Sequence, residues 1–469
     1  MKKTNEKRIG KVGMMSFGLL AACAAVCLCF TGCTTTSSDG PDPGTEPEGE
    51  KTMMAISIPV VKTYADNNAK SEEVAISTVD IYVYGGSLET HESLTLSAFT
   101  LVTDKYQMNN PIEVLSGSKR IYVGINLPAA AKTVIESGGG LQGLYQATTL
   151  RDAISNSSGF AMFSVNTTAN TAFTIEAGVV APRTESKNVF DITVARWAAK
   201  VTARKADNLS TAPQNKASGA TFQTTATGDL TFCMGNVNTK LYPLQKKDAV
   251  GVIEDPNYAS NYTSFGSDFV NDFGTNTSLI PTAYVEVNTN GTAATARNTK
   301  YTVENTSESP YLQGLMSYVS IRAKFAPDEI ITAYTPGQTD SLTRASNSTV
   351  QNDLYVYTTA GGEYLYFTSA TVAGSWATAT DGENFLGNYK NGYCYYLVYL
   401  DPKAEYMAPY ASIRNFFYDV RITNFNSLGY PNPEEPDPEG PLGTLTMLMV
   451  DVTIQNWVIV GMDTDLGEL

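Results

Sequence analysis

Short apolar runs separated by turn-forming residues recur along most of this chain, and they constrain its fold more than any other feature. In residues 52–61, apolar side chains alternate with smaller or polar ones, which is the period-two pattern of a half-buried strand. Long amphipathic helices do not alternate with such runs, so the sequence predicts an all-β fold of sandwiches or barrels. Short helices are expected between Pro128 and Ser155, where Ala, Leu and Gln are frequent. Comparable strand-like runs occupy residues 74–84, 120–126, 190–204, 228–238, 283–287, 314–325, 354–357, 364–369, 393–400, 418–424 and 445–460.

The length of the chain predicts two β-rich domains. Its 469 residues exceed the ~250–300 residues at which a single core stops growing. A polar run with one Pro and one Gly, residues 206–220, is a plausible place for a boundary. We therefore expect an N-terminal domain over residues 52–215 and a C-terminal domain over residues 216–469.

Residues 1–51 predict export followed by a flexible tether. A basic start, an apolar stretch over residues 14–30 and small residues before Cys33 form a secretory signal. A Cys directly after such a stretch resembles the bacterial lipobox, which implies cleavage before Cys33 and lipidation of its thiol (palmitate). An ordinary signal peptide or an uncleaved anchor is the alternative. Residues 34–51 are acidic, rich in Pro and Gly, and predict a solvated tether.

Charge and the scarcity of histidine argue against nucleic-acid binding and against catalysis. The formal net charge is −15, and an acidic surface repels phosphate backbones. The single His91 lies in a polar, turn-like stretch where a solvated side chain is expected, and His-based metal sites need more than one His. Acidic loops such as residues 248–255 lack the spacing of a calcium-binding loop. The sequence therefore predicts no enzyme, no cofactor and no metal site.

The cysteines and the aromatic clusters each leave two interpretations open. Outside the leader only Cys233 and Cys394 remain, and they form either one disulfide or two separate buried thiols. Aromatic clusters at residues 393–399 and 416–418 are typical of core and cross-strand pairs, with an exposed sugar-binding platform as the alternative. That alternative would make the chain a monomeric, glycan-binding surface lipoprotein.

Several segments together resemble the fimbrillins of Bacteroidetes, in particular the major-subunit family of the minor fimbriae. In chain order they read TMMAISIPV, VAISTVDIYVY, KRIYVGINLP, VARWAAKVTARK, LTFCMGNVNTKLYPLQ, GYCYYLVYL, SIRNFFYDVRITNFNSLGYPNP and LTMLMVDVTIQNWVIV. The resemblance implies two transthyretin-like or Ig-like β-sandwich domains in tandem, in a structural subunit of a surface fimbria that supports adhesion. It also implies export as an outer-membrane lipoprotein. The implied partners are copies of the chain, other fimbrial subunits and surface receptors of a host or of other bacteria.

The resemblance further implies that a protease removes the first strand and that the C-terminal strand of a neighbouring subunit fills the vacated groove. A sandwich that lacks a strand exposes unpaired backbone groups and an apolar trough, and β-augmentation can fill both. The alternative is that both segments are ordinary terminal strands. The leaving strand would be residues 52–61, with the inward-facing side chains Met54, Ile56, Ile58 and Val60. The donor would lie in residues 445–469, with the inward-facing side chains Leu448, Val450, Val452, Ile454, Val458 and Val460.

One departure from the family pattern concerns the maturing protease. Family subunits are commonly cut by an Arg-specific protease in the loop after the first strand, but no Arg occurs between Arg8 and Arg120. The basic residues of this region are Lys51, Lys62 and Lys70. Cleavage after Lys62 or Lys70 would release the first strand, whereas cleavage after Lys51 would not. Either a Lys-directed protease acts, or the subunit keeps its strand as an anchor or accessory component.

Overall fold

The computed structural model shows an all-β chain with a few short helices, which confirms the predicted fold class. The residues considered below belong to one compact unit, Gly49–Leu469. Among them, no helix combines the length and the apolar character that a membrane span requires. The structure describes residues 49–59, 70–138, 140–149, 154–156, 159–214, 219–249, 251–258, 269–272, 283–338, 341–347, 353–380, 384–401, 410–433, 437, 439–442 and 448–456.

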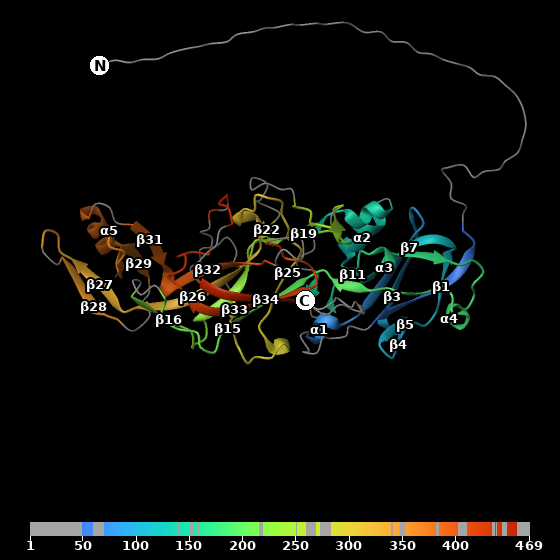
Figure 1. Cartoon of the computed structure of the whole chain (residues 1–469), viewed down its shortest axis with the longest axis horizontal. Helices are drawn as coiled ribbons and strands as arrows, with labels where there is room; N and C mark the ends of the chain where they lie inside the picture. Colours follow the sequence, from blue (N-terminus) through green and yellow to red (C-terminus); the bar gives the residue numbers. More distant parts are fainter. Residues whose placement is uncertain are drawn as a thin grey trace, which may run out of the picture. The chain divides into compact units, whose positions relative to one another are not determined.

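Two sheets enclose the first hydrophobic core (Figure 1). One sheet has the strand order β14-β11-β7-β2-β3, with β12 also paired to β7, and the other has the order β13-β1-β5-β4, with β6 paired to β1. Side chains such as Ile81, Val123 and Phe163 fill the space between them. The strands are β1 Lys51–Pro59, β2 Thr78–Tyr84, β3 Leu88–Thr95, β4 Phe99–Val102, β5 Lys105–Met108, β6 Ile112–Leu115, β7 Gly117–Ile125, β11 Met162–Ser164, β12 Ala172–Ile175, β13 Val189–Asp191 and β14 Val194–Arg196.

Short helices accompany these first sheets, as the sequence predicts. Helix α2 and the 3₁₀ helix η2 fall within the expected stretch between Pro128 and Ser155, and α2 buries Ala131 and Ile135 against the first core. The helices of this part are η1 Leu96–Ala98, α1 Ser71–Val74, α2 Ala129–Ser137, η2 Leu141–Tyr145, α3 Thr168–Thr171 and α4 Pro182–Glu185.

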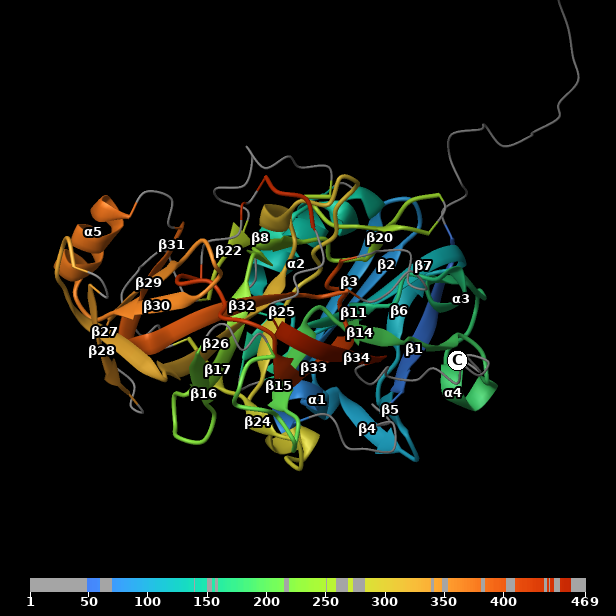
Figure 2. The ribbon, with the colours of Figure 1, turned by 60° about the vertical axis from the view of Figure 1, so that its left-hand side comes forward.

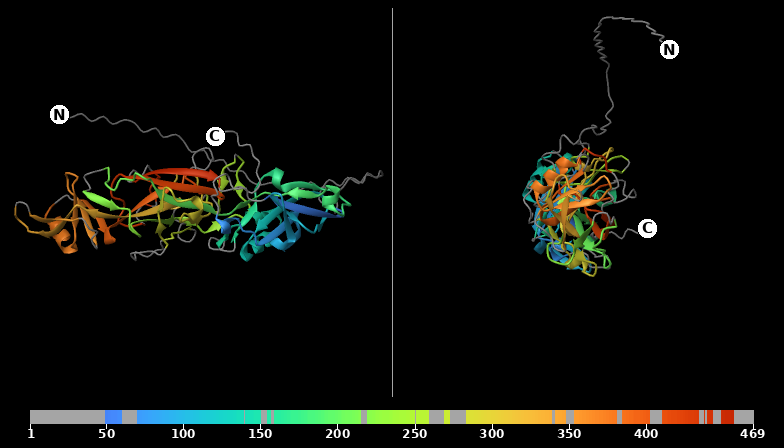
Figure 3. Two further views of the ribbon diagram at one scale, coloured as in Figure 1. Left: turned by 90° about the horizontal axis from the view of Figure 1, so that it is seen from below. Right: turned by 90° about the vertical axis from the view of Figure 1, so that its left-hand side faces the viewer.

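A second core lies between two further sheets. One has the order β24-β15-β33-β34 with β25 paired to β15, and the other has the order β16-β26-β17-β23 with β32 paired to β26. Figure 3 shows β33 and β34, drawn in red, side by side. The strands are β15 Ala199–Lys205, β16 Ala220–Gln223, β17 Leu230–Gly235, β23 Val285–Glu286, β24 Asn288–Thr289, β25 Lys300–Thr302, β26 Tyr318–Pro327, β32 Tyr393–Tyr399, β33 Phe416–Phe425 and β34 Leu448–Asn456.

A third sheet is inserted between β26 and β32, which are themselves neighbours in the second core. Its strand order is β28-β27-β30-β29-β31, and α5 lies against it (Figure 1). Burial alternates along β29, since Leu354 and Val356 join the second core, whereas Tyr355 and Tyr357 pack on the α5 side with Trp376. The elements are β27 Glu329–Tyr334, β28 Leu342–Ser346, β29 Leu354–Thr358, β30 Tyr364–Phe367, α5 Ala370–Ala379 and β31 Asn384–Tyr389.

Small elements complete the described part of the chain. Four two-stranded sheets pair β9 with β10, β8 with β19, β18 with β22, and β20 with β21. Their strands are β8 Thr148–Thr149, β9 Ser155–Asn156, β10 Gly159–Phe160, β18 Val237–Asn238, β19 Lys240–Leu241, β20 Lys246–Lys247, β21 Ile253–Glu254 and β22 Phe269–Val270. The 3₁₀ helices are η6 Ala294–Ala296, η7 Gln313–Leu315 and η8 Lys390–Gly392.

The single strand expected over residues 190–204 is wrong, because the chain breaks into β13, β14 and β15 there. The break coincides with the passage from the first core, which includes Trp197 and Ala198, to the second core, which begins at Ala199. The indole N–H of Trp197 donates to the Pro243 carbonyl at 2.9 Å and fixes the crossing. The predicted domain boundary at residues 215 and 216 falls on a segment outside the described residues and stays a prediction.

A buried charged cluster joins α1 to the strands at this crossing. The Glu73 carboxylate accepts from the Lys200 ammonium at 3.0 Å and from the Tyr301 hydroxyl at 2.6 Å, and the Glu73 backbone carbonyl accepts from Arg196 at 2.6 Å. The side chains of Glu73 and Lys200 are fully buried. Burial lowers the pKa of Lys200, because desolvation opposes its charge, while Glu73 counteracts that effect.

We expect Glu73→Ala to lower the free energy of unfolding by about 3–5 kcal/mol, because it leaves the Lys200 ammonium buried without its carboxylate. Chemical denaturation of the purified protein measures the loss. The matched control is Glu72→Ala, which removes the neighbouring, partly exposed carboxylate of the same helix. Equal effects of the two substitutions would show that the buried pair contributes nothing specific.

Candidate functional site

Strand β1 occupies the middle of its sheet and has partners along both edges. It runs parallel to β13, where Ala55 pairs with Val189 and Ser57 with Asp191. Its other edge is antiparallel to β6 from Lys51 to Met54 and to β5 from Ser57 to Pro59. The side chains Met54, Ile56 and Ile58 are buried in the first core, whereas Val60 lies outside the described residues.

Asn188 holds the first half of β1 through its side chain and its backbone. Its φ of 54° is left-handed, which Asn tolerates better than most residues. The side-chain amide donates to the Met53 carbonyl at 3.1 Å, and the Asn188 carbonyl accepts from the Ala55 N–H at 2.9 Å. The Thr52 hydroxyl donates to the Glu176 carbonyl at 2.9 Å and accepts from the Val179 N–H at 3.0 Å. Backbone groups of β1 are therefore satisfied outside the regular ladder as well as within it.

Helix α4 lies beside β1 (Figure 2). Its residue Arg183 spans an interruption in the hydrogen-bond ladder of β1. Residues 109–111 separate β5 from β6, so the middle of β1 lacks a regular partner on that edge. The guanidinium fills this gap by donating to the Ile56 carbonyl at 2.9 Å and to the Met108 carbonyl at 3.2 Å, and it lies 3.5 Å from the Ser57 hydroxyl. Burial lowers the pKa of Arg183, and the nearby Asp191 carboxylate counteracts this.

The sequence pattern predicts β1 but gives no indication of the two side chains that donate hydrogen bonds to its backbone, Arg183 and Asn188. Arg183 and Asn188 lie far along the chain from β1 and show no periodic pattern. Only local sequence features could have drawn attention to these two residues. Arg183 follows Pro182, which begins a short helix, and Asn188 lies directly before a β-type run.

The three predicted cleavage residues fall in different settings. Lys51 lies within β1, pairs with Leu115, and its ammonium donates to Glu113 at 2.7 Å, which raises the pKa of Lys51. Lys70 immediately precedes α1, and Lys62 lies outside the described residues.

Strand β34 contains four of the predicted donor positions and lies at the end of its strand order. It is antiparallel to β33, and the register pairs Val450 with Ile422, Val452 with Val420 and Ile454 with Tyr418. The β33 partners in these pairs are fully buried in the second core. Leu448 pairs with Phe425. Cys33, Val458 and Val460 lie outside the described residues, so their predicted roles stay predictions.

His91 lies on strand β3 instead of the turn-like, solvated stretch that the sequence suggested. Its imidazole stacks on Tyr82, with 4.5 Å between ring centroids, and approaches the carboxylates of Asp80 at 3.4 Å and Glu136 at 3.3 Å. Lys132 also donates to Asp80 at 2.7 Å. The histidine therefore belongs to a charged cluster between strands β2 and β3 and helix α2.

The cysteines and the aromatic clusters are structural. Cys233 and Cys394 are free and buried, and burial raises the pKa of each thiol to about 12. Most side chains of residues 393–399, together with Phe417 and Tyr418, are buried, which confirms that these clusters belong to the core. The sugar-binding platform that they offered as an alternative is therefore not formed by these residues.

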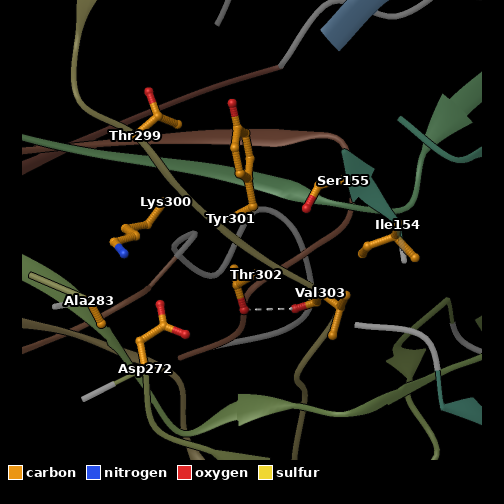
Figure 4. A pocket seen from close by; sticks show the side chains of 9 residues that line it. All are labelled: Ile154, Ser155, Asp272, Ala283, Thr299, Lys300, Tyr301, Thr302 and Val303. Atoms are coloured by element: carbon orange, nitrogen blue, oxygen red, sulfur yellow. Dashed lines mark hydrogen bonds between the residues drawn. The ribbon is translucent and has the colours of Figure 1, made fainter. Parts of the chain in front are cut away.

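A cavity of about 380 Å³ lies beside β25 (Figure 4). Its charged lining side chains are Asp272 and Lys300, with hydroxyls from Ser155, Thr299 and Tyr301, and the Thr302 hydroxyl donates to the Val303 carbonyl. A lining with one carboxylate and one ammonium does not supply the pair of carboxylates that glycoside hydrolysis uses for general acid and base catalysis. In the described parts of the chain, no group of three or more His, Cys, Asp or Glu side chains could hold a metal ion.

Comparison with known proteins identifies a family for the C-terminal region. Residues 387–463 match the family described as "Major fimbrial subunit protein type IV, Fimbrillin, C-terminal", which confirms the resemblance to fimbrillins. These residues include β32, β33 and β34. A search of curated proteins finds no match.

Several solved structures align with most of this chain at low sequence identity. A fimbrilin of Porphyromonas gingivalis W83 is 15% identical, with a TM-score of 0.46 over 88% of this chain and 99% of that chain. A Parabacteroides distasonis ATCC 8503 protein described as a candidate cell adhesion protein is 13% identical, with a TM-score of 0.47 over 87% and 100%. The tip fimbrial protein Mfa3 of Porphyromonas gingivalis is 12% identical, with a TM-score of 0.36 over 87% and 100%.

We expect a Lys-specific protease to cut the intact protein after Lys62 or Lys70 before it cuts after Lys51. The backbone at Lys51 is held in the ladder with β6, and a paired backbone must open before a protease can bind it. Intact mass and N-terminal sequencing identify the cut. The control Lys62→Gln/Lys70→Gln should resist cleavage in this region, and early cutting after Lys51 would contradict the expectation.

Proposed function

We propose that this chain, whose residues 387–463 match the fimbrillin C-terminal family, is a structural subunit of a cell-surface fimbria that supports adhesion. It is exported as a lipoprotein anchored at Cys33 in the outer membrane, and a protease then cuts after Lys62 or Lys70. The subunit polymerises when the C-terminal strand of another copy replaces β1. Its partners are copies of itself and other fimbrial subunits.

The position of β1 is the observation that carries the proposal. It is the first strand after the acidic tether, yet both of its edges are paired and its apolar side chains fill the core. Its removal would leave two strand edges and an apolar trough without a partner. An extended segment from another molecule can satisfy both requirements.

The position of β34 supports the donor half of the proposal. It pairs with β33 and ends the described strand order of its sheet, so a single ladder holds it. Donor and acceptor belong to different cores, which makes the contact between copies heterologous. A heterologous contact propagates into a filament where its geometry does not close a ring.

Deletion of Leu445–Leu469 should abolish polymers while export continues, because the deleted chain keeps its groove but has no strand to donate. Wild-type protein treated with a Lys-specific protease is expected to give SDS-resistant ladders on gels, whereas the treated deletion variant should remain monomeric. Untreated wild-type protein is the control for the need to remove β1.

A mixing experiment shows whether the deletion variant is still folded. The protease-treated deletion variant should accept a strand from a wild-type subunit but has no strand to donate, so it should end the growing polymer. Increasing amounts of this variant should therefore shorten the ladders of wild-type protein. Fibres of normal length from the deletion variant alone would refute donor-strand exchange. N-terminal sequencing of surface-extracted fibres should also begin after Lys62 or Lys70.

A further inference from the structure

The first strand and the last strand resemble each other in sequence. Residues 52–60 read TMMAISIPV, and residues 446–454 read TMLMVDVTI. Both begin with Thr-Met, and every second position from the third onward is apolar in both. In this alignment Leu448, Val450, Val452 and Ile454 take the places of Met54, Ile56, Ile58 and Val60. The alignment puts Asp451 in the place of Ser57, which is the one position where a neutral side chain becomes charged.

Two cationic side chains and one carboxylate lie near Ser57, namely Arg183, Lys105 and Asp191. Arg183 lies 3.5 Å from its hydroxyl, and the strand register places Asp191 and Gln107 opposite it. Asp191 is already paired with the Lys105 ammonium at 2.5 Å. The Asp191 carboxylate therefore pairs with Lys105 and also acts electrostatically on Arg183, beside a residue that is only 2% exposed. An acidic side chain at this position would balance the charge.

We propose that residues 446–454 of a second copy replace β1 in this register, so that Asp451 pairs with Arg183. This inference rests on the proposed strand exchange and specifies the occupant of the groove and its alignment. Arg183 is then a specificity-determining residue, because its charge favours an incoming strand with an acidic residue at this one position. A shift by one residue would turn the apolar side chains to the wrong face.

Two further positions favour the incoming strand in this register. Thr446 falls at the place of Thr52, whose hydroxyl bonds with the Glu176 carbonyl and the Val179 N–H. Thr453 falls at the place of Pro59, which pairs with Lys105 but has no N–H to donate. The donor therefore keeps the hydroxyl and adds a backbone donor that β1 lacks.

Charge reversal in two separate preparations tests the pairing. Asp451→Arg and Arg183→Asp place like charges at every interface, so each protease-treated variant alone should polymerise at least about tenfold more slowly than wild type. The double variant restores opposite charges at every interface and should recover polymerisation. An equimolar mixture of the two single variants should also recover, because each donor then meets a complementary acceptor only on the other variant.

Arg344→Asp is the matched control, since it reverses an arginine of the third sheet that pairs with Glu329 and Glu363 far from β1 in the chain. It should polymerise as wild type does. The register would be overturned if wild type forms ladders and the single variants polymerise equally well. It would also be overturned if neither the mixture nor the double variant rescues the single variants. In both cases the proposal of strand exchange would still stand. Failure of protease-treated wild type to polymerise would overturn both proposals.

Discussion

The pairing of β1 along both edges is the constraint on which the rest of the first core depends. Terminal strands commonly lie at the edge of a sheet, where their loss leaves only one neighbouring strand edge without hydrogen-bond partners. β1 instead lies between β13 on one side and β5 and β6 on the other, with Met54, Ile56 and Ile58 buried. Loss of β1 would therefore leave two strand edges without partners and expose the apolar side chains that now pack against it.

The elements of this fold were largely predictable from alternation, and the exceptions have physical reasons. Alternating runs such as β1 and β32 form strands because every second side chain enters a core. The run over residues 190–204 is broken, since the chain passes between two cores at Trp197, and periodicity carries no information about which core a residue joins. Helix α5 was missed because its Gly, Thr and Val residues offset the helix propensity of its alanines. The packing of Trp376 and Ala373 against the third sheet stabilises the helix.

The candidate site was predictable only in its apolar half. Alternating Met and Ile side chains identify an inward-facing strand, but nothing in their spacing indicates that Arg183 and Asn188 would meet its backbone. Those contacts join residues more than a hundred positions apart, and the fold alone brings them together. His91 shows the same limit, because its polar neighbours suggested a solvated turn, while pairing with β2 places it on a strand against Tyr82.

The proposed strand exchange would move the C-terminal strand between two settings that differ in their partners. In its own chain β34 has the partner β33, and the register sets Asp451 opposite Arg421. In the place of β1 the same residues would lie between two partners and against an arginine that burial has partly desolvated. A second ladder adds backbone hydrogen bonds, and a charge pair is stronger where water is scarce. Under the proposed exchange the strand would therefore gain a second ladder, while Asp451 would face Arg183 instead of Arg421.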